Sequence, residues 1–217
     1  MSDSLIEAAA QLSNPIDRRV YGVAPAQVIS NEDTHGEGRV QIMLPWIPGH
    51  KPWARVAMPM TGAGHGVYFI PQAGDEVLVA FGQGDVRDPF VVGSLWNGRD
   101  QPPATGLTDP RAKRIIKTPA GHVVTLDDVG RSVEIKTADG QRLLMDAKRI
   151  ELDAGRGAAK LTLETAGNVT IKSTAELKLE GSTVKLDGKV SAEVHGASLD
   201  LKGDATCAIS AATVRVN

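Results

Sequence analysis

Apolar and polar residues alternate along most of this chain, and the alternation changes character near residue 110. Between residues 20 and 100, apolar, β-branched and aromatic residues gather in short runs separated by Gly, Pro, Asn and Asp, which predicts strands joined by turns. The six runs are VYGVAPAQVIS, GRVQIMLP, WARVAMP, GVYFIP, DEVLVAF and PFVVGSLW. No helical period lies between them, so the pattern favours a small closed barrel over a sandwich.

The last run is bounded by turn signals, with Gly84-Asp85 before it and Asn97-Gly98 after it. These dipeptides favour tight turns, so the run is predicted to be a single strand that closes the barrel. We expect its core-facing side chains to be Phe90, Val92 and either Leu95 or Trp96.

Segments of different composition flank the barrel. SLIEAAAQL, residues 4–12, predicts a short helix, because Ser4 and Glu7 have the spacing of a capping box. After the barrel, a stretch rich in Pro, Gly and Thr disfavours both helix and strand. The predicted organisation is therefore a helical segment at 1–19, a barrel at 20–100, a linker at 101–119 and a stalk at 120–217.

The stalk contains neither proline nor aromatic residues, and its apolar residues recur with a regular period. Runs such as VEIKT, KLTLET, ELKLEG and TVKLDG alternate every second residue, which is typical of half-buried strands. From residue 171 onward, the second apolar residue of each run follows the previous one by 8 or 7 residues in turn. These positions, the predicted inward-facing row, are Ile171, Leu179, Leu186, Val194, Leu201, Ile209 and Val216.

In a single chain, burying this narrow apolar stripe would not offset the entropy lost on folding. Folding costs about 1–2 kcal/mol per residue in backbone entropy, whereas each buried Leu or Ile returns only about 1.5–3 kcal/mol. Three chains around one axis would cover each stripe and pair every strand edge. The predicted fold class is therefore all-β, with a small barrel followed by a homotrimeric, triple-stranded β-helix. Its blunt end would expose Val214, Val216 and Asn217, which suggests that a tip partner binds there.

Composition adds limits on location and ligands. All aromatic residues precede residue 97, and the net charge is −2 overall and −4 over residues 1–100, which argues against a nucleic-acid-binding barrel. The single cysteine, Cys207, cannot form an intrachain disulfide. With no apolar run near 18 residues and no charged leader, we expect a soluble protein that stays in the bacterial cytoplasm until it is assembled.

No catalytic or metal-binding pattern stands out. The GAGHG segment at 62–66 lacks the Gly-Lys-Ser/Thr ending of a phosphate-binding loop and is better explained as a tight turn. The histidines are scattered, and His195 is expected to be solvated rather than to bind an axial metal. Asp127-Asp128 lie where no spare sequence could build a cleft. We therefore expect no enzyme activity, no cofactor and no metal.

Residues 20 to 103 closely resemble a known family in the segments YGVAPAQVIS, GRVQIMLPW, WARVAMP and GVYFIPQAGDEVLVAFGQGDVRDPFVVGSLWNGRDQPP. The resemblance is to the oligonucleotide/oligosaccharide-binding (OB) barrel of contractile-injection spikes, which include phage baseplate assembly protein V and the type VI secretion protein VgrG. VgrG-like proteins carry a large hub ahead of this barrel, whereas here about 20 residues precede it. The resemblance therefore implies a minimal spike whose hub is a separate polypeptide.

The resemblance also implies a mechanical function. The barrel would dock on a trimeric baseplate hub, the β-helix would puncture the target cell envelope, and a small PAAR-repeat protein would cap the tip. The assembled protein would then reside in the baseplate of a phage tail or injection particle. Two alternatives remain open: a VgrG-like carrier of effectors, and a single-stranded nucleic-acid-binding OB protein.

Overall fold

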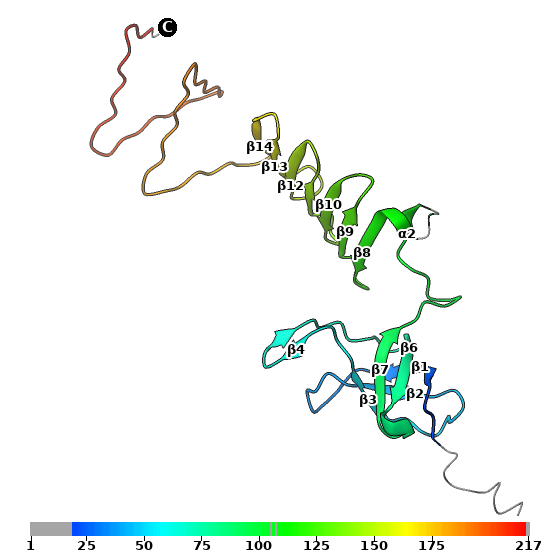
Figure 1. Ribbon diagram of the computed structural model, residues 1–217. Helices are drawn as coiled ribbons and strands as arrows, with labels where there is room; N and C mark the ends of the chain where they lie inside the picture. The colour runs from blue at the N-terminus through cyan, green and yellow to red at the C-terminus, as the bar shows by residue number, and fades with distance from the viewer. Residues whose placement is uncertain (1–18, 105, 107, 216–217) are drawn as a thin grey trace, which may run out of the picture.

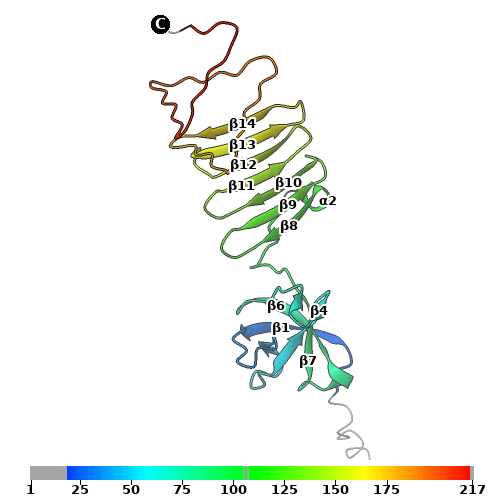
Figure 2. The same ribbon diagram turned by 90° about the vertical axis from the view of Figure 1, so that its left-hand side faces the viewer.

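The computed structural model describes residues 19–104, 106 and 108–215. Two β units follow one another along an elongated molecule: a small barrel and a seven-stranded sheet, after which the chain continues without further strands (Figures 1 and 2). The all-β prediction is confirmed. The helix predicted at 4–12 lies outside the described residues.

The first unit is a closed five-stranded barrel in the order β1-β2-β3-β7-β6. All neighbours are antiparallel except β3 and β7, which are parallel, and β1 closes the barrel against β6. A small hairpin, β4 and β5, and a short 3-10 helix, η2, connect the strands. The bounds are β1 Val23–Ser30, β2 Val40–Met43, β3 Trp53–Val56, β4 Thr61–Gly62, β5 His65–Gly66, β6 Glu76–Phe81, η2 Gly82–Gly84 and β7 Pro89–Ser94.

The barrel core consists of small and β-branched side chains that face inward from alternate strand positions. Ile42, Leu44, Val77 and Val79 are fully shielded from solvent. This pattern confirms the predicted strands at five of the six apolar runs. The sixth, GVYFIP, contributes only Gly66 to β5, and residues 67–71 form no strand.

The inward register of β7 differs from the prediction. Val91 is 1% exposed and Pro89 is buried, whereas Val92 is 46% exposed and Trp96 is 65% exposed. Because alternation starts from the buried Pro89 and Val91, Phe90 and Val92 face the other side, and the predicted register is one residue out of step from the start of the strand. A bulge follows, where Leu78 pairs with Gly93 and Val79 pairs with Val91, so that Val92 has no partner.

The turn between β1 and β2 is organised around Asp33, whose side chain is only 5% exposed. Its carboxylate accepts hydrogen bonds from the backbone N–H groups of His35, Glu37 and Arg39, and from the Arg39 guanidinium at 2.9 Å. The hydrogen bond from the Arg39 side chain lowers the pKa of Asp33 well below its usual range. The carboxylate of Asp33 is therefore charged, and in this form it holds the turn together.

Asp33→Asn is expected to lower the melting temperature of the barrel, because the amide can neither pair with Arg39 as an anion nor accept the same set of N–H groups. The pKa of Asp33 is lower in the folded state than in the unfolded chain, so its stabilisation is present above the unfolded value of about 3.9 and fades as pH falls further. All three tryptophans lie in the barrel, so their fluorescence reports its melting. The melting temperature of wild type should be higher than that of the variant at pH 7, and this difference should narrow below pH 4. A difference in melting temperature that does not depend on pH would contradict this account.

The second unit is a seven-stranded antiparallel meander in which each strand pairs with its neighbours in sequence. A short helix, α2, precedes it. The bounds are α2 Asp109–Ala112, β8 Lys113–Lys117, β9 Val123–Asp127, β10 Ser132–Lys136, β11 Arg142–Met145, β12 Arg149–Asp153, β13 Ala159–Glu164 and β14 Val169–Ser173. The strands lie across the long axis of the molecule and succeed one another along it (Figure 2).

This sheet differs from the predicted stalk in two respects. It already begins at Lys113, within the range assigned to the linker. Over residues 120–173 the strands pair with each other in one chain, whereas the sequence led us to expect strands intertwined with those of other chains. The reason is the turns: Gly121, Gly140 and Gly167 have positive φ values of 94–95°, which lets the chain reverse in tight hairpins.

Candidate functional site

One face of the seven-stranded sheet is almost entirely apolar. Residues that pair across neighbouring strands share a face, so the strand registers define two parallel rows on it. The first row is Ile116, Val124, Ile135, Leu143, Leu152, Leu161 and Ile171. The second row is Arg114, Leu126, Val133, Met145, Ile150, Leu163 and Val169. We call these two rows the apolar face; Arg114 is its only polar member.

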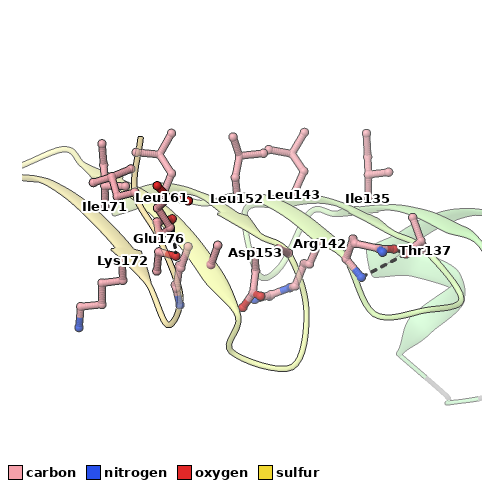
Figure 3. A pocket seen from close by; sticks show the side chains of 16 residues that line it. Ile135, Thr137, Arg142, Leu143, Leu152, Asp153, Leu161, Ile171, Lys172 and Glu176 are labelled. Carbon is pink, nitrogen blue, oxygen red and sulfur yellow. Dashed lines mark hydrogen bonds between the residues drawn. The ribbon is translucent and has the colours of Figure 1, made fainter. Parts of the chain in front are cut away.

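The apolar face is open to solvent in the single chain. Ile171 is 53% exposed and Leu152 is 46% exposed, whereas core residues of the barrel are below 9%. Figure 3 shows the first-row side chains from Ile135 to Ile171 projecting together from one side of the strands, along a groove of about 570 Å³. A continuous exposed apolar surface of this kind marks a protein interface.

The opposite face of the sheet is polar and carries a network of charges. At its centre, the Glu151 side chain is only 2% exposed and accepts a hydrogen bond from Arg142 Nη1 at 3.2 Å. Lys160 Nζ lies 2.9 Å from its other oxygen, and Arg149 Nε lies 3.3 Å from that oxygen. Arg142 also pairs with Glu134, which raises the pKa of the guanidinium. The buried carboxylate of Glu151 is compensated by cations of the same chain, so this face does not require a partner to bury it. We therefore interpret it as the solvent-facing side of the sheet.

The predicted inward-facing row continues beyond the sheet. Ile171, its first member, lies in β14 on the apolar face. The next five members lie in residues 174–215, which form no strand in one chain, and their exposed fractions run from 62% to 82%. They are Leu179, Leu186, Val194, Leu201 and Ile209. At the predicted tip, Val214 is 54% exposed, and Val216 and Asn217 lie outside the described residues.

Sequence reasoning missed the apolar residues of β8 to β13 as an interface. Their signal was visible as alternation in stretches such as VVTLD and RIELD. However, the first-row residues are 8, 11, 8, 9, 9 and 10 apart, so they do not follow the 7–8-residue period of the later segment. The irregular spacing reflects hairpin loops of different lengths, and only the strand registers align these residues.

The residues considered as catalytic or metal-binding candidates lie in separate parts of the chain and form no common site. Residues 62–66 form the β4–β5 hairpin, which is explained by a turn. Asp127 accepts a hydrogen bond from the Gly130 N–H within a turn, and Asp128 lies 3.7 Å from Arg114. His195 and Cys207 are exposed. Within the described residues, no three His, Cys, Asp or Glu side chains are grouped so as to hold a metal ion.

Among the residues that the structure describes, none of the helices has the length and apolar character needed to cross a bilayer.

Comparison with protein families gives two matches that together follow the two β units. Residues 24–96 match the type VI secretion system/phage-baseplate injector OB domain, and residues 113–217 match the phage baseplate V C-terminal trimerisation domain. The second match covers the apolar face and the whole segment after it. The exposed surface thus lies in a region whose family description is trimerisation.

Curated relatives are similar over about half of this chain. The actin cross-linking toxin VgrG1 of Vibrio cholerae is 30% identical over 114 residues, which are 50% of this chain and 10% of the toxin. The type VI secretion system spike protein VgrG2a of Pseudomonas aeruginosa is 33% identical over 115 residues, which are 48% of this chain and 14% of that protein. The chain thus matches only a tenth to a seventh of the length of these relatives. Because the two baseplate V models together match most of its length, this chain belongs to the phage baseplate V and VgrG-like family of structural spike proteins.

Proposed function

We propose that this protein is the homotrimeric central spike of a contractile tail or injection machine. Three copies bring their apolar faces together around one axis, and the segment that follows winds into a narrow rod. The observation that carries the proposal is the apolar face, which spans all seven strands and, among the described residues, remains largely open to solvent in one chain.

The strength of such an assembly follows from the area that it would bury. Seven of the nine Leu and Ile side chains on the apolar face are 38–53% exposed in the single chain, and completing the burial of each returns part of the roughly 1.5–3 kcal/mol that a whole side chain provides. Two rows across seven strands repeat this gain many times in every chain. The assembly would therefore resist dissociation, as a puncturing device requires.

The segment after β14 supports three chains rather than two. Its period of 7–8 residues leaves room for one short strand and one corner, and only two apolar side chains per strand face inward. With no hairpin turns to pair these strands in one chain, the free edge of β14 and all later edges need partners from other copies. Three copies can supply them while remaining closed.

The two ends of the spike would bind different partners. Exposed aromatic side chains on the barrel, including Tyr21, Tyr68 and Trp96, suit docking on a separate trimeric hub. At the other end, three copies of Val214, Val216 and Asn217 would form an apolar blunt tip suited to a PAAR-type cap. Contraction of the sheath would then drive the rod, which has no proline after Pro119, through the target envelope.

A type VI spike that carries effectors is a second candidate, and the names of the relatives favour it. The two candidate functions share the barrel and the trimer but predict different neighbouring genes. Adjacent genes for a tail hub and sheath of phage type would support the tail spike, whereas adjacent type VI components would support the carrier.

The proposal predicts a trimer with a shielded thiol. Light scattering of the full chain should give three times the 22.9 kDa mass of one copy. Cys207 is exposed in the single chain and lies two residues before Ile209, on the same side of a strand, so three copies should place it near the axis. Ellman's reagent should therefore react slowly with the native protein and at once in guanidinium. A monomer, or a trimer whose thiol reacts immediately, would contradict the proposed winding.

A further inference from the structure

The polar face of the sheet carries a straight row of basic residues along one edge. Cross-strand pairs join the row continuously from β8 to β14. In order, its seven positions are Lys117, Val123, Lys136, Arg142, Asp153, Lys160 and Lys172. We call the five cations the basic row. In Figure 3, Lys172 and Arg142 extend to the side opposite Ile171 and Leu143.

Only part of this positive charge is neutralised by the protein. Arg142 and Lys160 pair with the carboxylates of Glu134 and Glu151. Lys117, Lys136 and Lys172 have no carboxylate within 4.0 Å among the described residues. Lys172 lies directly opposite Lys160, whose ammonium group is paired with Glu151, so that the uncompensated charge of this pair is that of Lys172.

Along the other edge of the same face, the positive charges have carboxylate partners. Lys113 Nζ lies 2.9 Å from Asp109, and Arg149 Nε lies 3.3 Å from Glu151 and 3.8 Å from Asp146. The excess positive charge is therefore concentrated along one line. With strands about 4.8 Å apart, Lys117 and Lys136 are separated by about 10 Å and Lys136 and Lys172 by about 19 Å.

We propose that the basic row binds the phosphate headgroups of anionic lipids when the spike meets a bilayer. This inference rests on the proposed function, because packing of the apolar faces turns the three polar faces outward and gives the rod three such rows. A flat line of lysines suits a charged surface, since each lysine held at an anionic membrane adds about fivefold to binding. Single-stranded nucleic acid is disfavoured, because no aromatic side chain lies among residues 113–173 for bases to stack on.

The test is sedimentation of the full chain with vesicles of phosphatidylcholine alone, or of one part phosphatidylglycerol to two parts phosphatidylcholine. Wild type should bind only the anionic vesicles, and about 1 M salt should abolish binding, because the Debye length is then about 3 Å. Lys117→Gln/Lys136→Gln/Lys172→Gln should weaken binding at least tenfold. Equal binding to both vesicles, or no binding to either, would overturn the proposal.

A matched control removes three charges elsewhere in the sheet domain, through Lys113→Gln/Arg131→Gln/Lys148→Gln. This variant should keep most of the binding; an equal loss in both variants would show an effect of net charge and overturn the basic row. A DNA duplex that binds as tightly and depends on the same lysines would assign the row to nucleic acid instead. Light scattering of each sample tests the trimer separately: a monomer would contradict the proposed function, whereas a trimer that does not bind the anionic vesicles would contradict the basic row alone.

Discussion

Leu152→Asp is expected to abolish the trimer. Leu152 lies near the centre of the first row of the apolar face and is 46% exposed in the single chain. In the proposed assembly, three carboxylates would be buried together with no cation opposite them, which costs several kcal/mol per ion. Light scattering should therefore show a monomer or aggregate, whereas tryptophan fluorescence should show a folded barrel, because all three tryptophans lie before residue 97.

Thr170→Asp is the matched control for this substitution. Thr170 is exposed on the polar face of β14, opposite Thr162, so the same charge is added on the side that remains in water. Its stability should change by no more than about 0.5 kcal/mol, and the trimer should persist. If Thr170→Asp dissociates the protein and Leu152→Asp does not, then the polar face, rather than the apolar face, is buried in the assembly.

Leu186→Asp is expected to unwind the segment after the sheet. Leu186 is 82% exposed in the single chain and lies in the predicted inward-facing row, seven residues after Leu179. Three aspartates at the axis would lose hydration without a compensating charge and would repel each other. The trimer should then lose its resistance to detergent, and Cys207 should react at once with Ellman's reagent.

Lys185→Asp is the matched control at the neighbouring position, which is predicted to face outward. Lys185 precedes Leu186 and should face solvent, so reversing its charge should change stability by only about 0.5 kcal/mol. This variant should keep both the detergent resistance and the shielded thiol of wild type. If Lys185→Asp unwinds the segment and Leu186→Asp leaves it intact, the inward register is wrong by one residue.

Composition and hydrophobic period alone indicate that the chain divides into two units and that the second unit needs partners. The aromatic and proline residues end where the alternating stalk begins, so the barrel and the second unit could be separated without coordinates. Likewise, a stripe of two apolar residues per short strand cannot offset the entropy of ordering one chain, whatever its neighbours. These conclusions depend on local composition and period, and local composition is available in the sequence.

Only the tertiary structure decided which strands pair and which side chains meet. In β7 the inward register starts at Pro89 rather than at Phe90, and strand propensity alone does not distinguish the two registers. Residues 113–173 look like the later stalk in their alternation, yet hairpins at Gly121, Gly140 and Gly167 fold them into a sheet within one chain. The apolar face and the basic row exist only because those hairpins set the registers. Their neighbouring members are 5 to 19 residues apart in sequence, and pairing between strands is what brings them into line.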